Sequence, residues 1–142
     1  MEPPDEYFKA VVEPAYADFL AEPLSRHRAT SAATIVHHFY ERLYWYFKEY
    51  DPARLHGCAK DTDYLTFLTQ HCRDLALLRD SAESVKHQFL DRGLDYRLVA
   101  TATGVTNRIG NEFVIGNTGR TVSTLLDSVM KFWRGMLATG SP

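Results

Sequence analysis

The chain has 142 residues, a length that fits one domain. Hydrophobic residues make up 45% of it and charged residues 24%, as in an ordinary globular protein. The formal net charge of -2 excludes nucleic-acid binding through an overall basic field, so such a contact would need a local patch. The start of the chain lacks a secretion signal, and no apolar run nears the ~20 residues that span a bilayer. The sequence therefore predicts a cytoplasmic protein with no membrane partner.

The first third of the chain predicts helices. Residues 5–22 fit one broken helix or two short ones, with Pro14 in the first turn of a helix over about 14–21. Ser25 is a suitable N-cap for a long helix over about 26–50. Apolar residues repeat along that helix at spacings of one, three and four, which predicts a broad buried stripe. Its members are Ile35, Val36, Phe39, Leu43, Tyr46, Phe47 and Tyr50.

Two more helices are expected in the middle of the chain. Asp51-Pro52 ends the long helix, and a short helix follows over about 63–71. The next helix covers about 74–90, with Asp74 as its N-cap. Its apolar residues step by three and four and so share one face. These residues are Leu75, Leu78, Ala82, Val85 and Phe89.

The last third predicts a β-hairpin over about 95–116 and a final helix over about 121–137. Alternating residues form the two strands, and Asn and Gly between them suit a turn. An isolated hairpin is marginally stable, so it should pack against the helices. The predicted fold is therefore mainly α: a four- to five-helix antiparallel bundle in one domain, 1–142, with one appended hairpin.

The side of the 26–50 helix opposite its apolar stripe carries aromatic residues next to polar ones. This composition is unexpected for the exposed face of a monomer and indicates a second packed surface. That surface could meet another helix of the same chain or another subunit. The functional interpretation is a homodimer or a protein partner. The residues of this predicted interface are His37, His38, Glu41, Tyr44 and Trp45.

A polar flank beside the apolar face of the 74–90 helix offers a second candidate site. It contains Arg79, Asp80 and His87. One interpretation is an exposed helix face with ion pairs four residues apart, such as Arg79 with Glu83. The functional interpretation is that Arg79 holds an anion while His87 transfers a proton, since imidazole titrates near neutral pH.

A metal site is a further alternative. Two pairs of ligand-type residues lie four apart on their helices: His37 with Glu41, and Glu83 with His87. Facing pairs of this kind could bind a metal, although the Glu-x-x-His spacing of carboxylate-bridged bundles is absent. Cys58 and Cys72 lack metal-site spacing. Glycine-rich phosphate loops and the common hydrolase motifs are also absent, so we expect no cofactor and no dedicated metal site.

The segment LLRDSAESVKH at 77–87 resembles the Arg-Asp…Lys-His motif of uncharacterised bacterial proteins built as small helical bundles. More broadly, residues 25–90 are similar to the HEPN superfamily of helical domains. This resemblance implies a homodimer cleft that cleaves RNA without metal. Arg79 would bind the scissile phosphate, His87 would act as general base or acid, and Asp80 would orient one of them.

The same resemblance implies other roles, because the superfamily includes non-catalytic members that assemble complexes in bacterial conflict, stress-response and RNA-processing systems. Seven residues separate Arg79 from His87, so a regular helix places them about 12 Å apart along its axis. One phosphate would then reach both only across a bend or between subunits. The preferred hypothesis is a non-catalytic interaction or assembly module. The alternatives are a metal-independent endoribonuclease and a small-ligand or metal-binding bundle.

Overall fold

The computed structural model describes residues 1–86, 96–100, 111–115 and 120–142, with side chains described for 1–80 and 120–142. It is mainly helical, as predicted. The helices are α1 (Pro4–Tyr7), α2 (Glu13–Ala21), α3 (Arg26–Tyr50), α4 (Asp61–His71), α5 (Arg73–Lys86) and α6 (Val122–Thr139). A π-helical turn, η1 (Phe8–Val12), joins α1 to α2, and a 3₁₀ turn, η2 (Pro52–Leu55), follows α3.

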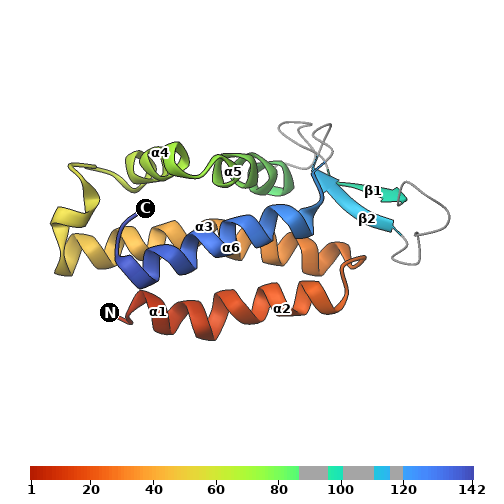
Figure 1. Ribbon diagram of the computed structural model, residues 1–142, viewed down its shortest axis with the longest axis horizontal. Coiled ribbons are helices and arrows are strands. Elements are labelled where there is room, and N and C mark those ends of the chain that lie inside the picture. The colour runs from red at the N-terminus through yellow and green to blue at the C-terminus, as the bar shows by residue number, and fades with distance from the viewer. Residues whose placement is uncertain (87–95, 101–110, 116–119) are drawn as a thin grey trace.

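The helices stack in three layers (Figure 1). One layer holds α4 and α5, the middle layer holds α3 and α6, and the third is the rod of α1, η1 and α2. Helix α3 runs antiparallel to α2 in one neighbouring layer and to α4 and α5 in the other. Within the middle layer, α3 and α6 lie side by side and run in the same direction. Within the described ranges, no helix is long and apolar enough to cross a membrane.

The N-terminal rod runs without a break through α1, η1 and α2, and α2 agrees with the predicted helix over about 14–21, with Pro14 in its first turn. Pro4 opens the rod, and Pro14 lies inside it, in the first turn of α2. A proline inside a helix lacks an N–H and crowds the carbonyl four residues earlier. The wide turn of η1, directly before Pro14, accommodates both effects because its hydrogen bonds reach one residue further.

The long helix α3 coincides with the predicted 26–50 span. The Ser25 hydroxyl accepts a hydrogen bond from the Arg28 amide at 3.3 Å, which caps the helix as expected. Helices α2, α4, α5 and α6 all contact α3. The buried Trp133 indole of α6 donates to the Val36 carbonyl of α3 at 2.9 Å. The core is therefore built around α3.

Two short strands lie at the end of the bundle away from the termini (Figure 1). The strands β1 (Tyr96–Ala100) and β2 (Asn111–Ile115) pair antiparallel, with Tyr96 opposite Ile115 and Leu98 opposite Phe113. β2 contacts α6, which gives this two-stranded ribbon helical support. The predicted turn between the strands and the predicted end of the 74–90 helix lie outside the described residues.

An ion pair joins the beginning of α5 to the beginning of α6. Two guanidinium nitrogens of Arg120 donate to the two carboxylate oxygens of Asp74, at 2.9 and 3.0 Å. Both side chains are partly buried, and bidentate pairs of this kind are among the stronger polar contacts. The hydrogen bond from Arg120 holds the pKa of Asp74 below its usual value.

We expect Asp74→Asn to lower the free energy of unfolding at pH 7 by about 1–2 kcal/mol. Because the pKa of Asp74 is lowered in the folded state, this stabilisation is present above about pH 4 and is lost as the pH falls further. Urea unfolding of both proteins at pH 7 and at a series of pH values below 4 measures the difference, which should narrow as the pH falls. Lys131→Gln, which removes the exposed pair with Asp127, should cost less than about 0.5 kcal/mol.

Candidate functional site

Two of the five residues predicted on the outer face of α3 are buried instead. His37 is 4% exposed and Tyr44 is 1% exposed. The Tyr44 hydroxyl donates to the Ala59 carbonyl at 2.8 Å, and its ring packs against Tyr64 of α4. The prediction failed because α4 and α5 cover the flank of α3, which buries a wider arc than one apolar stripe.

His37 is buried, and its ring lacks a hydrogen-bond partner among the described residues. Both ring nitrogens are inaccessible to solvent, and neither is bonded to any side chain or backbone group that the structure describes. The ring lies edge-on to His38 and Tyr40, with centroid distances of 4.8 and 5.4 Å. Burial, followed by the nearby charges of His38 and Arg79, lowers the pKa of His37 to about 3. His37 is therefore neutral at physiological pH, and its unpaired nitrogens cost stability.

Glu41 is committed to neighbours on α3 other than His37. Its Oε1 lies 3.0 Å from Nδ1 of His38 and accepts a hydrogen bond from the Tyr40 hydroxyl at 3.3 Å. The His37–Glu41 pair considered for a metal site therefore does not form. In the part of the chain that the structure describes, no group of three His, Cys, Asp or Glu residues is placed to hold a metal ion. The other pair, Glu83 and His87, lies outside the described side chains.

Arg79 and Asp80 lie together, partly buried, on α5. The Arg79 Nε donates to Asp80 Oδ1 at 3.3 Å. The positive charge of Arg79 acts on His37 of α3. The structure thus associates Arg79 with His37, a pairing that sequence reasoning missed because it placed His37 on the outer face. His87, the predicted partner of Arg79, lies outside the described residues.

Trp45 lies on the outer face of α3, as expected, and is 47% exposed. By helical geometry it points away from Val36, which is fully buried in the core. The edge of the Tyr44 ring contacts it at 5.1 Å, and Nζ of Lys48 lies 5.0 Å from its centroid. His38 and Glu41 are also exposed here, with 47% and 42% of their side chains accessible. We call the exposed residues His38, Arg42, Trp45, Lys48 and Glu49, together with the half-buried Glu41, the Trp45 face.

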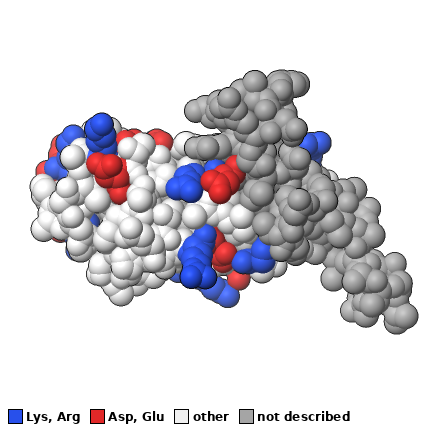
Figure 2. Space-filling model, turned by 90° about the horizontal axis from the view of Figure 1, so that it is seen from above, with Lys and Arg blue, Asp and Glu red and all other residues white. Residues whose placement is uncertain are grey.

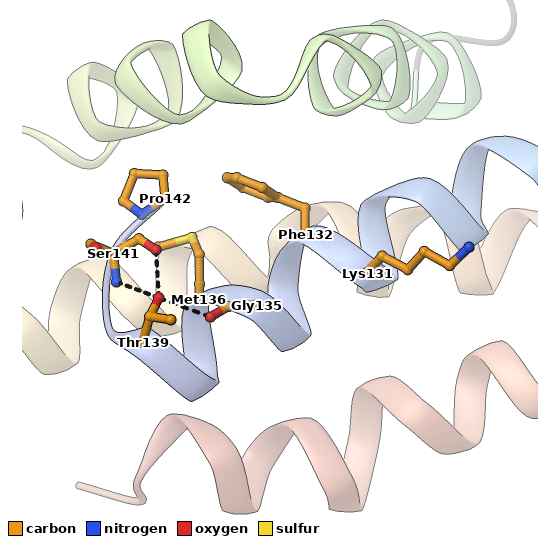
Figure 3. A pocket seen from close by; sticks show the side chains of 7 residues that line it. All are labelled: Lys131, Phe132, Gly135, Met136, Thr139, Ser141 and Pro142. Carbon is orange, nitrogen blue, oxygen red and sulfur yellow. Dashed lines mark hydrogen bonds between the residues drawn. The ribbon is translucent and has the colours of Figure 1, made fainter.

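A hollow of about 420 Å³ lies along the second half of α6 (Figure 3). Phe132 and Pro142 point from it towards the α4–α5 layer, while Lys131 extends away from the other lining residues. The Thr139 hydroxyl is already bonded to the carbonyls of Gly135 and Ser141, at 3.0 and 2.9 Å. A small-ligand site needs converging polar groups that are available to the ligand, and this hollow presents few.

Charged side chains on the α4–α5 face form mixed groups. Figure 2 shows basic and acidic side chains next to one another on the described part of this face, with uncharged surface between the groups. A nucleic-acid interface usually concentrates basic residues along one face. The described part of this face does not have that concentration.

Comparison with known protein families, curated proteins and solved structures identified no similar protein. The HEPN resemblance therefore depends on the residues at 77–87 alone. The functional argument depends on the geometry of the described residues.

Proposed function

We propose that this protein is a non-catalytic protein-interaction module and that the Trp45 face of α3 is its binding surface. The observation that carries this proposal is the exposure of Trp45 on a helix that is buried along its opposite side. An indole held by neighbouring rings loses little conformational freedom on binding, and Trp is enriched among residues that dominate binding energy. An exposed indole on a helix that the core holds in place is therefore well suited to anchor a partner.

The burial of His37 argues against acid–base catalysis by this histidine beside Arg79. A general acid or base needs access to the substrate and a pKa near the working pH. His37, the histidine beside Arg79, is buried and has a pKa of about 3, so it meets neither requirement. Arg79 also shares its charge with Asp80, which weakens its attraction for a phosphate. The HEPN resemblance is compatible with this proposal because that superfamily includes non-catalytic assembly proteins.

Photo-crosslinking from position 45 tests this function. We expect a benzophenone amino acid in place of Trp45 to form covalent adducts with a protein in the native host cells, detected by mass spectrometry. The same substitution at Leu24 is the control, because Leu24 is 49% exposed but lies before the first residue of α3, about 20 residues from Trp45. Equal adduct yields at both positions, or none at 45, would contradict the proposal. RNA cleavage that is lost in His87→Ala would support the endoribonuclease instead.

A further inference from the structure

Four charged residues surround Trp45 and lack charged partners that would neutralise them. Within the described side chains, Arg42, Lys48 and Glu49 form no ion pair, and Glu41 contacts only the imidazole of His38 and the Tyr40 hydroxyl. The Arg42 guanidinium stacks on the Tyr7 ring, 4.1 Å from its centroid, which leaves its edge available. Lys48 lies over the Trp45 ring. Glu49 is hydrogen-bonded to the neighbouring Tyr50. Within the described side chains, neither Glu41 nor Glu49 is paired with a Lys or Arg, so the two acidic and two basic residues can still form ion pairs with a partner.

The four charges are arranged symmetrically about Trp45. With about 100° per residue, Glu41 and Lys48 lie about 40° and 60° to one side of Trp45. Arg42 and Glu49 lie about 60° and 40° to its other side. Along the helix axis, Glu41 and Arg42 precede Trp45 by about 4.5–6 Å, and Lys48 and Glu49 follow it by the same distances. Each flank therefore has an acidic residue at one end and a basic residue at the other.

We propose that the partner of the Trp45 face is a second copy of this chain, with the two α3 helices packed antiparallel about a two-fold axis at Trp45. This inference rests on the proposed interaction function. A two-fold axis brings the same flank of each helix together and reverses its direction. Glu41 then faces Lys48 of the second copy, and Arg42 faces Glu49 of the second copy. Symmetry doubles these contacts to four ion pairs around two stacked indoles.

The antiparallel direction also brings the helix dipoles into a favourable arrangement, because the positive end of each α3 lies beside the negative end of the other. A parallel pair about the same residue would make different contacts. It would place Glu41 opposite Arg42, and Lys48 opposite Glu49. Both packing directions pair opposite charges, so the presence of complementary charges does not distinguish them. Charge reversal at chosen positions does distinguish them, because each direction pairs different residues.

Sedimentation velocity of charge-reversed variants tests this dimer. Wild type should form a dimer whose dissociation constant rises with salt concentration. Glu41→Lys and Lys48→Glu should each raise that constant about tenfold or more, because each turns two attractions into two repulsions. An equimolar mixture of the two variants should form a heterodimer with nearly wild-type affinity, since every facing pair is then opposite in charge. Circular dichroism verifies that each variant is folded.

Glu6→Lys and Lys9→Glu are the matched controls, because they make the same charge changes at exposed positions of the N-terminal rod and should leave the dimer unchanged. A monomeric wild type, or a mixture that fails to associate, would overturn the dimer. Rescue of Glu41→Lys by Arg42→Glu rather than by Lys48→Glu would overturn the antiparallel direction. Crosslinking from position 45 to a different protein alone would overturn the dimer but preserve the interaction function.

Discussion

Replacing Trp133 with Ala should lower the free energy of unfolding by about 3–5 kcal/mol, the largest loss that we expect from a single substitution. The Trp133 side chain is fully buried, and its ring lies edge-on to Phe39 at 5.3 Å. The substitution removes the packing of a large indole and leaves the Val36 carbonyl without this donor. Because whole domains are stable by only about 5–15 kcal/mol, this loss would remove a large share of the total stability. Urea unfolding followed by circular dichroism measures the loss.

Two variants separate packing from hydrogen bonding at this position. Trp133→Phe keeps an aromatic ring but removes the indole N–H, and we expect it to cost about 1–2 kcal/mol. Phe132→Ala removes a neighbouring ring that is only partly buried, and it should cost less than Trp133→Ala. A loss below about 1 kcal/mol for Trp133→Ala would contradict a central place for this residue in the core.

Replacing His37 with Phe should stabilise the protein. A ring of similar shape preserves the packing and removes two buried nitrogens that have no hydrogen-bond partner among the described residues. Removing such groups should raise the free energy of unfolding at pH 7 by about 1–2 kcal/mol. Thermal and urea unfolding of the two proteins measure the gain. A loss of more than about 1 kcal/mol in both His37→Phe and His37→Leu would indicate a polar contact that the described residues lack.

The gain should increase at acidic pH. The pKa of His37 is about 3 in the folded protein and about 6.5 in the unfolded chain, so the unfolded chain takes up this proton first. Wild-type stability is therefore lost as the pH falls from 6.5 towards 3, by about 1.4 kcal/mol per pH unit from this residue. The advantage of His37→Phe should grow by about 2 kcal/mol between pH 6.5 and pH 5.

The groups around His37 set the control for that experiment. His38, Tyr40 and Glu41 come from α3, and Arg79 comes from α5. His38→Phe changes the exposed neighbour, which already has a carboxylate partner, and should not reproduce the growing advantage. Equal pH dependence in wild type and His37→Phe would show that His37 titrates normally in the folded state.

Local signals in the sequence predicted the long helices well. The Ser25 cap and the apolar repeat place α3 over Arg26–Tyr50, and the periodicity of the last segment predicts a helix close to the observed α6. These features depend on residues within a few turns of each other. Pro14 correctly indicated the first turn of α2, but the sequence did not predict the π-helical turn that joins α2 to α1.

The candidate site was predicted less completely. The exposure of Trp45 follows from its position opposite the apolar stripe of α3, and the structure places it there. The burial of His37 and Tyr44 depends on how α4 and α5 pack across the flank of α3, which one helix pattern does not encode. The same packing decides that Arg79 lies near His37. The correct predictions therefore depended on local sequence patterns. The wrong predictions concerned residues whose burial depends on contacts between distant segments.

The bond between Trp133 and Val36 also bears on how the protein folds during synthesis. It links residues 97 positions apart, so α3 emerges from the ribosome long before the helix that completes its environment. Until then the nascent chain exposes apolar surface around Phe39, which is fully buried in the finished fold. Such exposed surface is a target for chaperones and a cause of misassembly. The core around α3 is therefore completed only after α6 has been synthesised.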